Sequence, residues 1–187
     1  MDNRYLENVI AEIKPFFDEN GFKIFDNSWC LIASYDKSHK GLPYNAMTAS
    51  WGGMGVLWNK NVFFCFVRPQ RYTKEFIDNS DYISLSFFDE DKKKALTYCG
   101  RNSGRDGDKL KEAGFSPIIS DKGIVEFEDA KITVIGKKLF AADMKEALVY
   151  IGSMFGMGDI PFLSAEAVYY FRSNAFVLVM AIIGATP

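Results

Sequence analysis

The stretch N-A-M-T-A-S-W-G-G-M-G-V-L-W-N-K-N-V-F-F-C-F-V-R-P-Q-R-Y-T, residues 45–73, decides the fold of this chain. Its centre holds two runs of β-branched and aromatic residues, Val56–Trp58 and Val62–Val67, which are separated by Asn59-Lys60-Asn61. A short polar turn between two such runs predicts a β-hairpin. The glycine-rich stretch at 52–55 predicts a bend before the first strand of that hairpin.

A basic segment follows the hairpin directly. The second strand runs into R-P-Q-R-Y-T at 68–73, and Thr73 opens a predicted helix over Lys74–Asn79. The guanidiniums of Arg68 and Arg71, a hydroxyl and the N-terminus of a helix therefore come close together along the chain. Arginine forks and free backbone N–H groups are what a phosphate group needs. The segment therefore predicts an anion site at the end of the second strand.

The composition is that of one globular domain. The chain has 187 residues, of which 48% are hydrophobic and 25% are charged, so it can bury a substantial core. Its 17 phenylalanines and 9 tyrosines favour a β-rich core or a binding site for a planar ligand. No repeat, linker or low-complexity segment interrupts the sequence, which predicts a single domain over residues 1–187.

Charge and cysteine usage argue against several classes of function. The net charge of −2 argues against nucleic acid as a partner, because phosphate backbones require a broad basic surface. The chain has three widely spaced cysteines and no C-x-x-C pair, which predicts free buried thiols in a reducing cytoplasm. His39 is the only histidine, so no metal site built from histidines is expected. His39 itself is interpreted either as a solvated loop residue or as a residue at the mouth of a ligand pocket.

The two ends of the chain carry no targeting signal in this interpretation. The N-terminus lacks the basic and apolar regions of a signal peptide. The apolar run Ala175–Ala185 is too short to cross a bilayer as a helix. The sequence therefore predicts a cytoplasmic protein without a membrane partner.

Apolar periodicity predicts the remaining elements. Further strands are predicted over Phe22–Phe25, Trp29–Tyr35, Asp81–Phe88, Val125–Phe127, Ala130–Lys138 and Ala175–Ile183. Helices are predicted over residues 4–18, Asp89–Cys99, Asp108–Ala113, Met144–Met157 and Leu163–Arg172. The helical segment at 4–18 and the C-terminal segment 143–185, with two helices and a last strand, flank a β-rich centre.

Three motifs together resemble the flavin reductase-like family of FMN-binding split barrels, the flavoredoxin branch in particular. They are N-A-M-T-A-S-W at 45–51, R-P-Q-R-Y-T at 68–73 and C-G-R-N-S-G-R-D-G-D-K at 99–109. Each motif alone is common, whereas the three in this order are specific. The resemblance runs from roughly Trp29 to Ile135. It implies a β-rich α+β fold: an FMN-binding split β-barrel, Greek-key-like, with flanking helices.

The resemblance also implies where FMN would bind. The phosphate is expected near Arg68, Arg71 and Thr73, and the isoalloxazine along the small residues Thr48 to Ser50. The loop after Cys99 is expected to close over the ribityl–phosphate side. The implied cofactor-binding residues are Asn45, Met47, Thr48, Ala49, Ser50, Trp51, Arg68, Gln70, Arg71, Tyr72, Thr73, Ser103, Arg105 and Lys109.

The function implied by the resemblance is that of an FMN-binding oxidoreductase. It is either an NAD(P)H:flavin reductase or a flavoredoxin-type electron carrier, with NAD(P)H as the candidate electron donor. The cofactor carries the electron chemistry itself, so no catalytic side chain is predicted. A homodimer is expected, with a small molecule or a protein as electron donor or acceptor. Many similar proteins place a histidine where this chain has Phe176, which leaves open a non-catalytic flavin-binding or sensing module.

Overall fold

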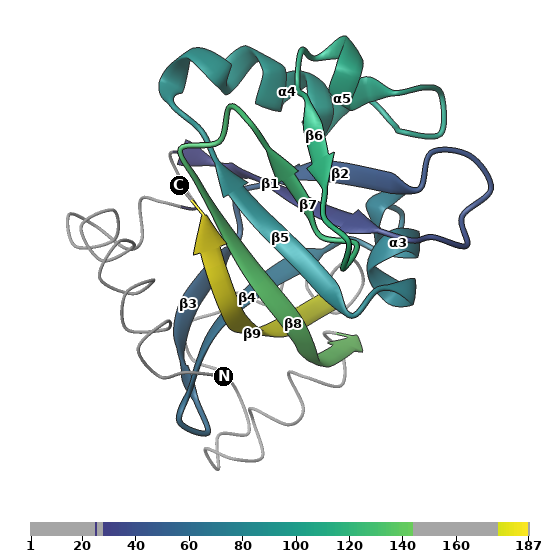
Figure 1. The fold of residues 1–187 in the computed structure, drawn as a ribbon. Coiled ribbons are helices and arrows are strands. Elements are labelled where there is room, and N and C mark those ends of the chain that lie inside the picture. Colours follow the sequence, from purple (N-terminus) through teal and green to yellow (C-terminus); the bar gives the residue numbers. More distant parts are fainter. Residues whose placement is uncertain (1–24, 26–27, 144–175, 187) are drawn as a thin grey trace, which may run out of the picture.

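The computed structural model in Figure 1 describes residue 25 and residues 28–143 and 176–186. The predicted helices at 4–18, 144–157 and 163–172 lie outside the described residues. Within the described part of the chain, no helix is long and apolar enough to cross a membrane.

The described part of the chain is mostly strand. The strands are β1 (Cys30–Tyr35), β2 (Tyr44–Ala49), β3 (Gly52–Leu57), β4 (Lys60–Val67), β5 (Tyr82–Phe87), β6 (Pro117–Ile119), β7 (Val125–Phe127), β8 (Ile132–Asp143) and β9 (Phe176–Thr186). The helices are α3 (Thr73–Asn79), the 3-10 turn η2 (Glu90–Lys92), α4 (Lys93–Arg101) and α5 (Lys109–Glu112). Figure 1 shows α4 and α5 gathered over one end of the sheet.

Seven strands form one antiparallel sheet in the order β2-β1-β5-β8-β9-β4-β3, and β6 and β7 form a separate pair. The strands β2 and β3 are therefore the two edges of the large sheet, although only Ser50 and Trp51 separate them along the chain. Two linking residues span at most roughly 11 Å between strand ends. The sheet must therefore curl until its edges approach each other, which leaves a barrel that is open between β2 and β3.

Two cores hold this curled sheet. Alternate residues of β1 point to opposite faces, so Cys30 and Ile32 lie in one core and Leu31 and Ala33 in the other. The first core fills the barrel, and the second lies between the sheet and α4, α5 and β7. All four side chains are fully buried. This explains why β1 is an apolar run rather than an alternating one.

The hairpin of β3 and β4 corrects two predictions. Its turn is at Trp58 and Asn59, whose φ angles are 51° and 58°, and not at Asn59-Lys60-Asn61. Two consecutive positive φ angles are typical of a type I′ turn, whose twist matches the hairpin. The predicted glycine-rich bend is also wrong, because residues 52–57 form β3 and pair with β4 from the first residue, Gly52 with Cys65.

The glycines of β3 serve close packing rather than bending. A Cβ atom at Gly52 would lie 2.6 Å from the carbonyl oxygen of Phe64, and one at Gly53 would lie 2.6 Å from the Phe64 ring. A side chain does not fit at either position, so the two glycines let β3 lie against β4.

The other predicted elements differ from the structure mainly at their ends. Of the strand predicted at 22–25 the structure describes only Phe25, which is buried and helical rather than extended. Trp29 has a φ of 56°, so β1 begins one residue later than predicted. The strand β8 extends past its predicted end at Lys138 as far as Asp143, because its pairing with β9 continues to that residue.

Candidate functional site

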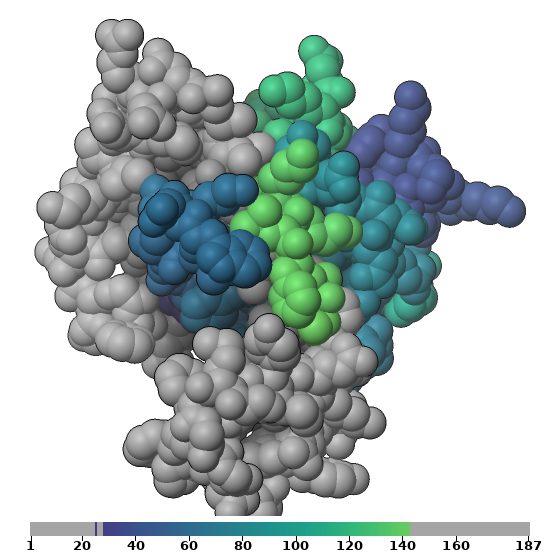
Figure 2. All heavy atoms as spheres, turned by 90° about the horizontal axis from the view of Figure 1, so that it is seen from below, coloured from purple at the N-terminus to yellow at the C-terminus, as the bar shows by residue number. Residues whose placement is uncertain are grey.

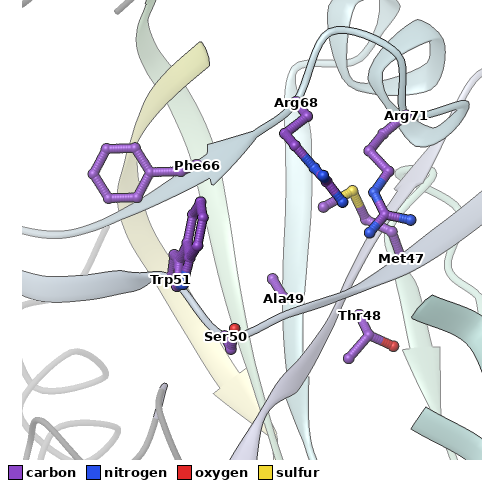
Figure 3. Close-up of a pocket in the computed structure, with 8 residues that line it drawn as sticks. All are labelled: Met47, Thr48, Ala49, Ser50, Trp51, Phe66, Arg68 and Arg71. Atoms are coloured by element: carbon purple, nitrogen blue, oxygen red, sulfur yellow. The ribbon is translucent and has the colours of Figure 1, made fainter. Parts of the chain in front are cut away.

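A pocket lies where the two edges of the sheet approach each other (Figure 3). Its volume is about 180 Å³. It is lined by Met47, Thr48, Ala49, Ser50, Trp51, Phe66, Arg68 and Arg71. In Figure 3 the rings of Trp51 and Phe66 lie at one end and the two arginines at the other. We call this space the ring pocket, because its small residues and aromatic end suit a flat molecule.

The floor of the ring pocket is the edge strand β2. Among the described strands, β2 pairs only with β1, so its outer edge has backbone N–H and C=O groups available to a ligand. Ala49 and Ser50 line the pocket with small side chains. Thr48 has a different task, since its hydroxyl donates to the carbonyl oxygen of Leu96 in α4 at 2.5 Å. The Thr48 side chain therefore fixes β2 to α4, and its contact with a ligand would come from the backbone.

A second pocket of about 180 Å³ adjoins the first and shares Met47, Arg68 and Arg71 with it. Its lining is Met47, Arg68, Gln70, Arg71, Tyr72, Thr73, Arg101, Asn102, Ser103 and Lys109. Four of these side chains are cationic and none is a carboxylate. We call this space the cation pocket. Its charge favours a compact anion.

Arg68 and Arg71 line both pockets, but their side chains make different contacts. The Nη1 atom of Arg71 donates to the carbonyl oxygen of Gly100 at 2.7 Å, near the end of α4. This contact holds the guanidinium over the cation pocket. Arg68 has no hydrogen bond or ion pair from its side chain to any residue that the structure describes.

Lys109 is a buried cation. Only 5% of its surface is exposed, and its Nζ donates to the carbonyl oxygens of Cys99 at 2.9 Å and Asn102 at 3.1 Å. Burial lowers the pKa of Lys109 to about 8, and the nearby charge of Arg71 acts in the same direction. An ammonium has three N–H groups. The third has no acceptor among the described residues, so it can serve an anion in the cation pocket.

The loop after α4 is attached to α3 by Arg105. The guanidinium of Arg105 forms an ion pair with Glu75 and lies 4.5 Å from the centre of the Tyr72 ring. The hydroxyl of Tyr72 is in turn 2.9 Å from Nε2 of His39. Arg105 lines neither the ring pocket nor the cation pocket, and its contacts attach the loop to α3. His39 packs in an aromatic cluster, stacked 4.4 Å from Phe76, rather than in solvent.

Three free cysteines are buried, as the sequence predicts. Burial raises the pKa of Cys65 to about 12 and the pKa of Cys99 to about 11, and it also raises the pKa of Cys30. Thiols with such pKa values stay protonated at neutral pH and are poor nucleophiles. None of the three lines either pocket.

The structure brings together every predicted cofactor-binding residue except Asn45 and Arg105. Asn45 is buried, and its side chain is hydrogen-bonded to Thr73, which lines the cation pocket. The structure adds three lining residues that sequence reasoning missed: Phe66, Arg101 and Asn102. Phe66 could have been found from strand periodicity, because it lies two residues before Arg68, which directly follows β4, and residues two apart in an extended chain point to the same side.

Comparisons with known proteins identify the fold. No family model matches the sequence, and no curated protein matches it. Several solved structures do match. The match to a flavoredoxin from Methanosarcina acetivorans has a TM-score of 0.59 and 18% sequence identity, and it covers 85% of this chain and 67% of the flavoredoxin chain. The match to an FMN-binding protein from Thermus thermophilus has a TM-score of 0.59 and 14% identity, and it covers 85% of this chain and 69% of that protein. The match to a protein with a split-barrel domain from Shewanella frigidimarina has a TM-score of 0.60 and 13% identity, and it covers 90% of this chain and 72% of that protein.

These similarities show that the chain has the split-barrel fold. They confirm the predicted β-rich α+β fold class. The ring pocket lies at the connection between the two sheet edges, because it is lined by the end of β2 and by Ser50 and Trp51, which lead into β3.

Proposed function

We propose that this chain binds FMN in the two adjoining pockets and passes electrons through it, as an oxidoreductase of the flavin reductase-like or flavoredoxin type. One observation carries the proposal. A pocket lined by small residues and two aromatic rings opens directly into a pocket lined by four cations and no carboxylate. FMN has the matching parts, a flat ring system and a terminal phosphate. Flavoredoxins and FMN-binding proteins among the solved structures of similar fold support the same function.

Each part of the site has a distinct task in this proposal. The backbone at the end of β2, at Ala49 and Ser50, would bind the polar edge of the ring, and Trp51 and Phe66 would cover its apolar end. The cation pocket would bind the phosphate. FMN, when bound, would supply the redox chemistry, which explains why the site needs no acid–base pair of its own.

The proposal is tested by the absorbance of the purified protein. We expect flavin absorption bands after incubation with FMN and gel filtration, and bleaching of these bands on reduction with dithionite. A protein that retains no flavin at micromolar FMN would contradict the proposal.

A second function, a flavin-binding or sensing module without turnover, is favoured by one residue. Phe176 is the first residue of β9, and its backbone lies opposite Val67 of β4. Val67 directly precedes Arg68 in the sequence. Histidine can donate a hydrogen bond or carry a positive charge near a flavin, whereas phenylalanine can do neither. Reduction of bound FMN by NADH in a stopped-flow instrument separates an NADH-dependent reductase from the electron carrier and the module. Rapid bleaching supports an NADH-dependent reductase, and bleaching by dithionite alone supports an electron carrier or the module.

The cation pocket leads us to expect tighter binding of FMN than of FAD. The phosphate of FMN ends in three acceptor oxygens and carries about −1.5 to −2 charges at neutral pH. The corresponding phosphate of FAD is joined to a second phosphate in a pyrophosphate, so it has a single charge and only two free oxygens and would use the four cations less fully. We expect FMN to bind at least about tenfold more tightly, which corresponds to about 1.4 kcal/mol. Titration by flavin fluorescence measures both affinities, and equal affinities would contradict the placement of the phosphate.

The contacts of Arg105 predict an effect on the rate of cofactor release. Replacing Arg105 with alanine removes the ion pair to Glu75 and the contact with the Tyr72 ring, which fasten the loop beside the cation pocket. Both side chains of the ion pair are half exposed, so we expect the barrier to FMN release to fall by only about 0.5–1 kcal/mol. This corresponds to a roughly two- to fivefold faster release. Glu75→Gln is the matched variant and should show the smaller part of the effect. An unchanged release rate in both variants would show that the loop does not limit release.

We also propose that the protein is a homodimer. Three large apolar side chains are strongly exposed on the β3–β4 hairpin and β8: Val56 at 72%, Trp58 at 79% and Phe140 at 51%. Both segments lie at the surface on the face shown in Figure 2. Exposed apolar groups of this size favour an interface. We expect light scattering to give twice the chain mass of 21.1 kDa, and Trp58→Lys to shift the protein toward monomer. A wild-type mass of one chain at micromolar concentration would exclude the dimer.

A further inference from the structure

Two buried polar side chains meet behind the cation pocket. Asn45 in β2 is 4% exposed and Thr73 at the start of α3 is 1% exposed. The Nδ2 atom of Asn45 donates a hydrogen bond of 2.9 Å to Oγ1 of Thr73. Thr73 lines the cation pocket and Asn45 does not. The hydrogen bond to the hydroxyl of Thr73 therefore connects Asn45 to that pocket.

The bond from Asn45 decides which way the Thr73 hydroxyl points. A hydroxyl has one proton to donate and two lone pairs to accept with. Since one lone pair accepts from Asn45, the O–H group must point away from Nδ2. It has no acceptor among the residues that the structure describes. The remaining direction in which it finds a partner is the pocket that Thr73 shares with Arg68, Arg71 and Lys109.

Asn45 is itself held in place from two sides. Its backbone is paired in β2 with Ser34 of β1. Gly104 packs against the side chain so closely that a Cβ atom at Gly104 would overlap Oδ1 of Asn45. A side chain that is fixed by a strand and by a loop backbone presents its amide in one orientation.

We infer that Asn45 is a positioning residue: it fixes the Thr73 hydroxyl as a hydrogen-bond donor toward the phosphate, and so makes the pocket selective for a phosphate monoester dianion over a neutral hydroxyl. The inference rests on the proposed function. With Thr73 set as a donor, the groups around the phosphate include the N–H groups of Arg68, Arg71 and Lys109 and no carboxylate. Dianionic phosphate oxygens only accept hydrogen bonds, so they satisfy this pocket. The terminal hydroxyl of riboflavin brings a proton that needs an acceptor and carries no charge.

The test compares affinities for FMN and riboflavin, because their ratio isolates the phosphate. In the wild type we expect FMN to bind much more tightly than riboflavin. Thr73→Val removes the donor and should lower the ratio of FMN affinity to riboflavin affinity about tenfold. Thr73→Ser keeps the hydroxyl and should keep this ratio. Asn45→Ala should lower the ratio about three- to tenfold. The double variant should show no further loss beyond Thr73→Val, because Asn45 acts through Thr73.

Controls separate a positioning role from a general structural one. Asn79→Ala removes a hydrogen bond of the same length, from Nδ2 of Asn79 to Asp36, outside both pockets, and should leave the ratio unchanged. Riboflavin affinity and melting temperature report whether each variant is folded. If Asn45→Ala does not fold, Asn45→Asp keeps the shape and can only accept, so it should lower the ratio at least as much.

Each outcome has one meaning. If the wild type binds neither flavin, the proposed function fails and this inference with it. If it binds both equally, the cation pocket does not hold the phosphate and the inference is overturned. If FMN is preferred and Asn45→Ala or Asn45→Asp preserves the preference, or if the losses at Asn45 and Thr73 add fully, the proposed function stands and the inference alone is wrong.

Discussion

Replacing Arg71 with alanine is expected to weaken FMN binding by about ten- to a hundredfold, or about 1.5–3 kcal/mol, which is the range for hydrogen bonds to charged groups. Arg71 lines both pockets, so it lies where the phosphate end of FMN would pass into the cation pocket. Its guanidinium is already held by the carbonyl oxygen of Gly100 at 2.7 Å. A group held before the ligand arrives loses little further freedom on binding, so its contact retains most of its strength.

Two comparisons make this prediction specific. Riboflavin lacks the phosphate, so its affinity should change less than threefold in Arg71→Ala. Arg71→Lys keeps the charge and loses the planar fork, and should fall between the wild type and the alanine variant. Isothermal titration measures all three proteins with both ligands. An unchanged dissociation constant for FMN in Arg71→Ala would place the phosphate elsewhere.

The sequence predicted most strands because their patterns are local. β7 matches its prediction at both ends, and the start of α3 at Thr73 follows from the segment after the hairpin. The order of the strands is not local. Nothing in the sequence near Ser50 and Trp51 shows that they connect the two edges of one sheet, because that follows from the pairing of β9 with both β4 and β8. The resemblance implied a ring site along Thr48 to Ser50, but its place at the connection between the two sheet edges required the structure.

The candidate site was predictable to the extent that its residues are close in sequence. The segment at 68–73 supplies one wall of the cation pocket and was identified by its composition. The environment of Lys109 was not predictable. A lysine between Asp108 and Leu110 is ordinarily expected in solvent, since lysine is almost never fully buried without a partner. Its burial depends on the end of α4, where the carbonyl oxygens of Cys99 and Asn102 accept hydrogen bonds from its ammonium group.

Because Lys109 is buried, we expect the protein to lose FMN affinity in alkaline solution. The pKa of Lys109 in the free protein is lowered to about 8, so the side chain is charged below pH 8 and neutral above it. A bound phosphate stabilises the charged form and raises that pKa in the complex. Above pH 8, binding must therefore take up a proton, and the affinity should fall by up to about tenfold per pH unit.

Other groups near the site do not account for such a change. Cys99 and Tyr44 titrate with pKa values of about 11 and 12, well above this window. Phosphate monoesters lose charge only below their second pKa of about 6. The affinity should therefore be highest between about pH 6.5 and 8, with an acidic limit set by the ligand and an alkaline limit set by Lys109.

Substitutions of Lys109 test whether this residue causes the alkaline limit. Lys109→Met should weaken FMN at pH 7 by about ten- to a hundredfold and abolish the alkaline limb, because no titrating cation remains in this position. Lys109→Arg should keep its charge throughout the range and also lack the limb, with affinity retained at pH 9. Riboflavin binding and melting temperature show whether each variant is folded. A wild-type affinity that is constant from pH 7 to pH 9, or an alkaline limb that persists in Lys109→Met, would show that Lys109 does not hold the phosphate.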